Sequence, residues 1–196
     1  QVAGYLQAAL LMRERTGKGQ HVDMSLMDCS IALLSNQATY HFTTGENPPR
    51  MGNAHAQVAP YGVFPVKDGY VILAPANDRL FHKLADLLGR NDWSGDPRFA
   101  HNGERVANAK ALDAEIAAAT AAWTKEALLD ACHAAGVPAG PINRLDEVFA
   151  DPQVAARGMK VEPGGMAGVR SPFTFSGAQL ALDRPSPLLG EHDPED

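Results

Sequence analysis

The spacing of apolar residues predicts a helix near the start of the chain. Val2, Leu6 and Leu10 recur at helical intervals, and we expect a helix over residues 4–15 that Gly17 or Gly19 ends in a left-handed conformation. No Ser, Thr, Asp or Asn stands ahead of it to accept its first N–H groups. We therefore expect this chain to be part of a longer protein.

The spacing of apolar residues changes after the glycine turn at residues 17–19. Residues 21–26 alternate between polar and apolar side chains, which predicts a buried strand. Helical spacing returns over residues 27–41, and Ser25 with Asp28 three positions later resembles a capping box for that helix. Residues 43–60 are rich in turn-forming residues and predict a long ordered loop.

The second part of the chain predicts a hairpin and several helices. Asp68-Gly69 is a strong turn signal between apolar strands at 61–66 and 70–74. Asn77 and Thr124 are expected to cap two of the helices, and Gly136 to end the second. The expected helices are 79–88, 105–122, 125–135, 145–150 and 154–157, with an extended segment at 137–142 and short strands within 159–175. The order of these elements predicts an α/β fold.

Composition excludes several classes of protein. The apolar fraction of 45% and the charged fraction of 20% are ordinary for a globular protein. The net charge of −6, without a basic stripe, argues against a nucleic-acid partner. No apolar run is long enough to span a membrane. Cys29 and Cys132 lack disulfide or metal spacing, which predicts reduced thiols in a cytoplasmic protein.

The usual catalytic motifs are missing. Residues 17–20 (Gly-Lys-Gly-Gln) follow a helix rather than a strand, unlike a phosphate-binding loop, and no G-x-S-x-G, H-E-x-x-H or G-x-G-x-x-G occurs. The seven histidines are scattered, and adjacent Cys132 and His133 cannot face one metal ion from a regular helix. We expect no metal site and no self-contained hydrolase.

Several blocks together resemble the class III coenzyme A transferases, the family of formyl-CoA and carnitine CoA transferases. The most specific is Arg-Glu-Arg-Thr-Gly-Lys-Gly-Gln-His-Val-Asp-Met-Ser-Leu-Met-Asp at 13–28. The other blocks follow in the family's order and are 52–53 with 59–61, 64–70, 96–99, 136–141, 151–153 and 187–192. The resemblance covers nearly the whole chain.

This resemblance implies a Rossmann-like large domain, a smaller inserted α/β domain and an interlocked homodimer. Residues 1–50 would belong to the large domain, 51–150 to the small one, and 151–196 would return to the large one. The partners implied are an acyl-CoA and an organic acid. Coenzyme A enters as the thioester substrate, and no covalently bound cofactor is implied.

The implied chemistry uses an aspartate that attacks the thioester and forms an acyl-aspartyl anhydride and then an enzyme–CoA thioester. The family places that aspartate shortly before Gln1, so no catalytic residue is expected in this chain, and the isolated chain is expected to be inactive. Asp23 and Asp28 are the nearest carboxylates, but they follow the glycine turn and are interpreted as a strand-end residue and a helix cap.

The resemblance also suggests substrate contacts. Formyl-CoA transferase has a glycine-rich loop over its aspartate where this chain has residues 54–58, so His55 and Gln57 could donate hydrogen bonds to an acyl or acceptor oxygen. Three further candidates for substrate binding are Asn53, Tyr61 and Arg50, and Leu26 matches a position that lines the CoA pocket. The structural alternatives are a loop histidine bonded to backbone, a solvated arginine and an ordinary core leucine.

Two other functions stay open. The α-methylacyl-CoA racemases share the turn signature, but they carry Asp-Gly-Gly-Ala-Pro-Phe-Tyr where this chain has residues 55–61, which favours a transferase. A non-catalytic binding or assembly module is the other alternative. The sequence does not indicate which acid is the acceptor.

Overall fold

The computed structural model describes residues 2–191. The chain divides into two compact units, Gln1–Gly52 and Asn53–Asp196, each described by itself. The boundary falls inside the predicted long loop. The assignment of 1–50, 51–150 and 151–196 to two domains stays a prediction.

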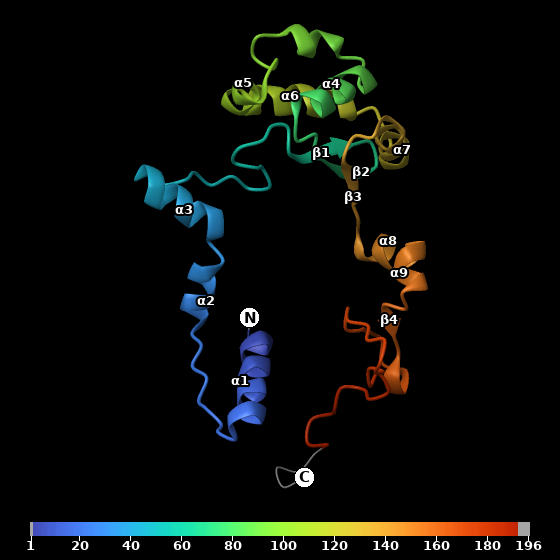
Figure 1. The fold of residues 1–196 in the computed structure, drawn as a ribbon. Helices are drawn as coiled ribbons and strands as arrows, with labels where there is room; N and C mark the ends of the chain where they lie inside the picture. Colours follow the sequence, from blue (N-terminus) through green and yellow to red (C-terminus); the bar gives the residue numbers. More distant parts are fainter. Residues whose placement is uncertain (1, 192–196) are drawn as a thin grey trace. The chain divides into compact units, whose positions relative to one another are not determined.

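The first unit is helical (Figure 1). It contains α1 (Val2–Thr16), α2 (Leu26–Ala32) and α3 (Ser35–Thr44). Helix α1 ends as predicted at Gly17, whose φ of 69° is left-handed and whose N–H donates to the Arg13 carbonyl at 2.8 Å. None of the three helices contains a buried residue.

Two sequence predictions fail in this unit. The strand expected at 21–26 is absent, because residues 18–25 are irregular and pair with no other described strand. The single helix expected at 27–41 is two helices, since the chain turns at Leu33 and Leu34 and Ser35 takes a φ of 42°. The Ser25 cap is confirmed: its side chain accepts from the Asp28 N–H at 3.0 Å.

The second unit is built on an antiparallel sheet. Strands β1 (Gly62–Val66), β2 (Gly69–Leu73) and β3 (Ala139–Ile142) lie in the order β1-β2-β3. Phe64 pairs with Val71 across the predicted hairpin, and both are buried. Burial alternates along β1 and β2, so one face of the sheet packs against the helices.

Four helices and one short 3₁₀ helix follow the hairpin and precede β3. They are α4 (Asp78–Leu87), η1 (Asn91–Gly95), α5 (Asn102–Ala107), α6 (Ala109–Thr120) and α7 (Lys125–Ala135). The Asn77 and Thr124 caps and the Gly136 ending are confirmed. The single helix predicted at 105–122 breaks at Asn108, whose side chain donates to the Glu104 carbonyl at 2.9 Å and competes with the helical backbone.

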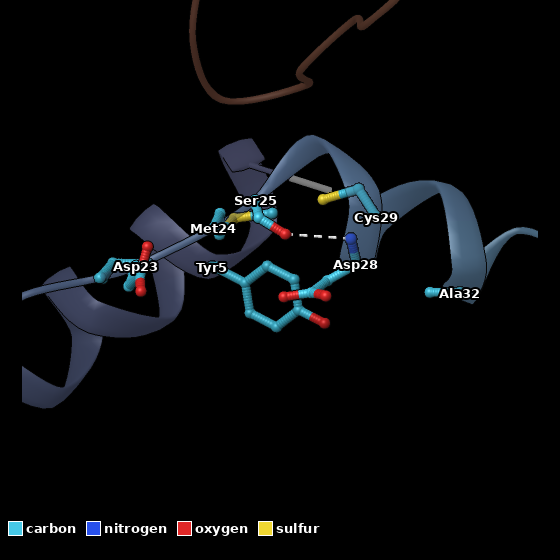
Figure 2. A pocket seen from close by; sticks show the side chains of 8 residues that line it. Tyr5, Asp23, Met24, Ser25, Asp28, Cys29 and Ala32 are labelled. Carbon is cyan, nitrogen blue, oxygen red and sulfur yellow. Dashed lines mark hydrogen bonds between the residues drawn. The ribbon is translucent and has the colours of Figure 1, made fainter.

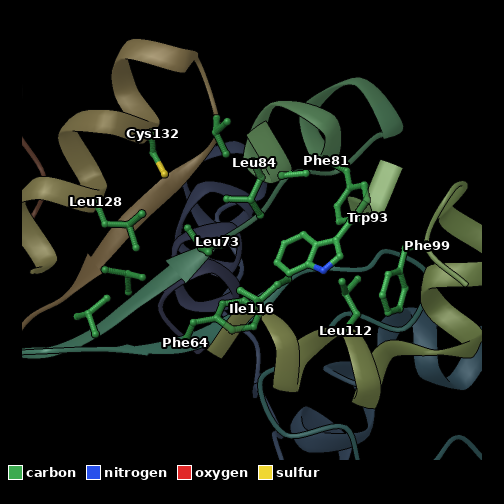
Figure 3. Close-up of a cluster of buried hydrophobic side chains, with 14 residues drawn as sticks. Phe64, Leu73, Phe81, Leu84, Trp93, Phe99, Leu112, Ile116, Leu128 and Cys132 are labelled. Carbon is green, nitrogen blue, oxygen red and sulfur yellow. The ribbon is translucent and has the colours of Figure 1, made fainter. Parts of the chain in front are cut away.

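One hydrophobic core joins the sheet to these helices (Figure 3). Trp93 stacks on Phe81 with ring centroids 6.2 Å apart, and its indole N–H donates to Glu115 at 2.7 Å, so the buried ring has its polar group satisfied. The Thr120 hydroxyl donates to the Pro65 carbonyl at 2.8 Å and fixes α6 to β1. The other large buried apolar side chains are Phe64, Val71, Leu73, Leu84, Phe99, Leu112, Ile116 and Leu128.

The remaining elements are short. They are α8 (Leu145–Ala150), α9 (Pro152–Ala156), β4 (Lys160–Val161), η2 (Pro163–Gly165) and β5 (Gly168–Val169). The predicted helix at 145–150 and the short strands within 159–175 are confirmed. No residue from 143 to 191 is buried, and the last buried residue of this unit is Val137, just before β3. The α/β prediction is confirmed.

Candidate functional site

The loop that holds most of the predicted substrate contacts runs from residue 53 to residue 61 and leads directly into β1. Asn102, at the start of α5, holds its backbone at two points. The Asn102 side-chain N–H donates to the Gln57 carbonyl at 2.8 Å, and its oxygen accepts from the Ala59 N–H at 3.2 Å. A single side chain therefore fixes the segment from Gln57 to Ala59.

Arg105, one turn further along α5, anchors the same segment from inside the protein. Its side chain is 0% exposed and its Nε donates to the Ala59 carbonyl at 2.6 Å. The rest of the guanidinium donates to the Phe99 carbonyl at 3.0 Å and to Asp78 at 2.6 Å, and it lies over the Phe81 ring. The Arg105 hydrogen bond holds the pKa of the Asp78 carboxyl below its usual range, so the buried guanidinium keeps a charged partner.

The loop tip remains exposed above this anchored base. His55 and Gln57 are both exposed, and the Gln57 N–H donates to His55 Nδ1 at 3.1 Å. With Nδ1 as acceptor, a neutral imidazole carries its proton on Nε2, which becomes a donor. The Tyr61 ring lies 5.4 Å from the His55 ring, centroid to centroid. The structure thus brings His55, Gln57 and Tyr61 together.

A pocket of about 400 Å³ lies beside the same loop. Asn53 lines it from the loop, and Asp113 lines it from α6. The small side chains Ala114 and Ala117 leave room in its wall. Burial raises the pKa of the Asp113 carboxyl above its usual value, because the pocket removes part of its hydration.

Two predicted residues lie in the other unit. Arg50 is exposed. Leu26 is the first residue of α2 and is 89% exposed, so it is not the buried strand residue that the pattern suggested. A pocket of about 300 Å³ in this unit is lined by Tyr5, residues 22–25, Asp28, Cys29 and Ala32 (Figure 2). The expected contact of Leu26 with CoA and the role of Arg50 remain predictions.

Sequence reasoning missed Asn102, Arg105 and Asp113. One signal existed for Arg105: in the single helix predicted at 105–122 it would share a core-facing stripe with the buried Leu112, although the observed helix breaks between them at Asn108. No comparable signal existed for Asn102, because its partners Gln57 and Ala59 are 45 and 43 residues away. Asp113 looks like an ordinary surface residue in an alanine-rich helix.

Within residues 2–191, no group of three or more His, Cys, Asp or Glu side chains is placed to hold a metal ion. In the same range, no helix has both the length and the apolar character needed to cross a membrane. Cys29 and Cys132 are free thiols, and burial raises the pKa of Cys132 to about 11.

The sequence of this α/β chain with its anchored loop matches a known protein family. The sequence profile of CoA-transferase family III matches residues 1–193. The succinate–glutarate CoA-transferase of Agrobacterium fabrum is 46% identical over 192 residues, which cover 95% of this chain and 48% of that protein. The acetyl-CoA:oxalate CoA-transferase of Acetobacter aceti is 38% identical, again over 95% of this chain and 48% of the relative.

A solved structure has the same fold. The CaiB/BaiF family protein from Brucella suis superposes with a TM-score of 0.84 at 52% identity, covering 96% of this chain and 50% of that one. The chain belongs to CoA-transferase family III, and the resemblance noted from its sequence is confirmed. It spans about half the length of the curated relatives that it matches. Its mixed α/β fold corresponds to part of the Rossmann-like architecture of that family.

Proposed function

We propose that this chain is part of a CoA-transferase that moves CoA from an acyl-CoA to a small dicarboxylic acid. The loop at 53–61 carries the proposal, because it holds exposed donors on a fixed backbone within a chain of this family. The relatives named succinate–glutarate and acetyl-CoA:oxalate CoA-transferase support a dicarboxylate as the acid.

The proposed reaction transfers CoA from the donor acid to the acceptor acid through two covalent enzyme intermediates. An enzyme carboxylate attacks the acyl carbonyl, the C–S bond breaks, and an acyl–enzyme anhydride and a CoA thiolate form. The thiolate attacks the enzyme side of the anhydride, which releases the donor acid and leaves an enzyme–CoA thioester. The acceptor carboxylate repeats the sequence in reverse and leaves as its CoA thioester. No covalently held cofactor is needed.

In this scheme His55 and Gln57 stabilise negative charge on the reacting oxygens. Each addition to a carbonyl places charge on oxygen, and a preoriented N–H donor lowers the energy of that state more than the energy of the bound substrate. The Nε2–H of His55 and the side-chain amide of Gln57 are donors of this kind. Asn53, Tyr61 and Arg50 are assigned to binding substrate, and Leu26 to contact with CoA.

We place the attacking carboxylate outside residues 1–196. The chain spans about half of the length of its relatives, which leaves the other half to carry that carboxylate. Asp28 lies in the first turn of α2, where the Ser25 side chain accepts a hydrogen bond from its N–H, and Asp113 lines a pocket of the second unit whose other residues are mostly small or apolar. The homodimer and the cytoplasmic location expected from the family are part of the same proposal.

The experiment is a transfer assay on the whole protein that carries this chain. Purified protein is mixed with succinyl-CoA and glutarate, oxalate or acetate, and the new CoA thioester is quantified by chromatography. We expect dicarboxylate-dependent transfer and little transfer to acetate. Loss of succinyl-CoA only by hydrolysis, whichever acid is present, would overturn the proposal.

The His55→Ala variant tests the assignment of this donor. We expect kcat/KM to fall by about a hundredfold to a thousandfold, the usual cost of losing one oxyanion donor. His133→Ala is the matched control, because His133 is exposed at the end of α7 and its side chain is remote in sequence from the loop. Equal rates for both variants would remove His55 from the mechanism.

A further inference from the structure

The loop at 53–61 has an unusual support. Three backbone groups near its end, the Gln57 carbonyl, the Ala59 N–H and the Ala59 carbonyl, are all bound by side chains of α5. The tip, residues 54–57, is exposed in contrast. The loop therefore has a fixed base and a solvent-facing tip.

Asn102 binds the base as a neighbouring strand would. Its amide donates to the carbonyl of one residue and accepts from the N–H of the residue two positions later, at 2.8 and 3.2 Å. An amide plane that makes both bonds fixes the direction of the chain as well as its position. Alanine at this position would leave both backbone groups to water.

Arg105 holds the Ala59 carbonyl from the side of the core. Its guanidinium is fully buried, with Nε on the Ala59 carbonyl and the other nitrogens on Phe99 and Asp78. Because a buried guanidinium with these partners cannot shift without losing its hydrogen bonds, the Ala59 carbonyl is held by a rigid group.

We infer that Asn102 and Arg105 are positioning residues: they hold the 57–59 backbone so that His55 and Gln57 present their donors in one geometry to the reacting oxygens. The inference rests on the proposed CoA-transfer function. Neither residue need touch substrate, since both act through the loop. The Gln57 N–H bond to His55 Nδ1 is the link from the held backbone to the imidazole.

The principal variant is Asn102→Ala in the whole protein. Asn102 is half-buried at the first turn of α5, where alanine is compatible with the helix, so the variant should fold. Asn108→Ala is the matched control, because that amide donates to Glu104 and Arg98 carbonyls rather than to the loop. Arg105→Lys is the second variant, since it keeps the charge but replaces the planar guanidinium, whose three nitrogens reach the Ala59, Phe99 and Asp78 oxygens, with a single ammonium nitrogen.

The first measurement is hydrogen exchange followed by mass spectrometry. In Asn102→Ala we expect peptides covering 53–61 to exchange roughly tenfold faster, while β1 and β2 keep their protection. Asn108→Ala should leave the loop peptides unchanged. Unchanged loop exchange in Asn102→Ala would overturn the inference even if the protein proved to have no CoA-transferase activity.

The second measurement is a double-mutant cycle on kcat/KM. Asn102→Ala should lower kcat/KM by about tenfold in the wild type and by less than about twofold in a His55→Ala/Gln57→Ala background, because its effect passes through those donors. Arg105→Lys should show the same pattern of kcat/KM losses in the two backgrounds. An undiminished loss in the double-variant background would make Asn102 a general structural residue and overturn the inference while the transfer function stands. Absence of transfer in the wild type would instead refute the proposed function. The hydrogen-exchange measurement would then decide by itself whether Asn102 and Arg105 hold the 57–59 backbone.

Discussion

The surroundings of Asp113 disfavour the ionised form of its carboxyl group. It lines the pocket beside the loop from α6, and burial raises its pKa. An acid with a raised folded pKa destabilises the protein at pH values above that pKa, where the fold holds the charged form. This penalty disappears as the pH falls through the folded pKa toward the unfolded value.

The Asp113→Asn variant should therefore be slightly more stable than the wild type at neutral pH, with a Tm higher by at most about 2 °C. The difference should vanish below about pH 4, where the wild-type carboxyl is protonated. Thermal unfolding at a series of pH values measures it. Asp130→Asn, an exposed position on α7, serves as control. A Tm gain that stays constant with pH would refute the electrostatic cause.

At this scale the sequence predicted the side chains of the loop but not their support. Candidate residues could be proposed there because the family motifs that contain them are local in sequence, and their roles stay predictions. Asn102 and Arg105 were missed because their contacts span more than forty residues, and no local pattern records which backbone carbonyl a distant amide will reach.

Helix ends provide the best test at the scale of elements. Asn77 has an extended backbone, and its side chain accepts from the Leu80 N–H at 3.0 Å, so it caps α4. The Asn77→Ala variant should lose about 1 kcal/mol of unfolding free energy because that N–H loses its partner.

Urea unfolding monitored through Trp93 and Trp123 measures this loss. The control is Asn91→Ala at the exposed start of η1, for which we expect a change below about 0.5 kcal/mol. Similar losses for the two variants would mean that removal of an asparagine, rather than of a cap, determines the effect.

Elements bounded by capping or turn-forming residues were predictable from the sequence, and elements without such residues were not. The hairpin with Asp68-Gly69 and the helices with Asn77, Thr124 and Gly136 were predicted because these residues bind or terminate the backbone directly. The prediction of a strand at 21–26 was wrong. Alternation of polar and apolar side chains indicates only that one side of a segment is apolar, whereas a strand also needs a neighbouring strand to pair with. Asn108 broke a helix through its own side-chain bond, which composition alone does not reveal.

The two units of the whole chain differ in their cores. The second contains the buried cluster around Trp93, whereas none of the helices α1–α3 has a buried residue. Local stability follows the number of buried apolar contacts. In the 196-residue chain, amides of α1–α3 should therefore exchange at least roughly a hundredfold faster than those of β1 and β2.

Hydrogen exchange by mass spectrometry tests this expectation, and the whole protein provides the comparison. There we expect protection of α1–α3 to rise, because their apolar residues, such as Leu6 and Leu10 at 50% exposure, would be covered by other parts of the family fold. Equal protection of α1–α3 and the sheet in the 196-residue chain would contradict the account. Periodicity identified these apolar positions correctly, but a helical pattern does not say what covers it.

The most direct test of the central claim is to locate the covalent CoA intermediate. The whole protein is incubated with succinyl-CoA without acceptor, quenched, digested and searched by mass spectrometry for a CoA thioester on a carboxylate. The account predicts one adduct, on an aspartate outside residues 1–196, that disappears when glutarate is added. An adduct on Asp23, Asp28 or Asp113, or none at all in a protein that transfers CoA, would contradict it.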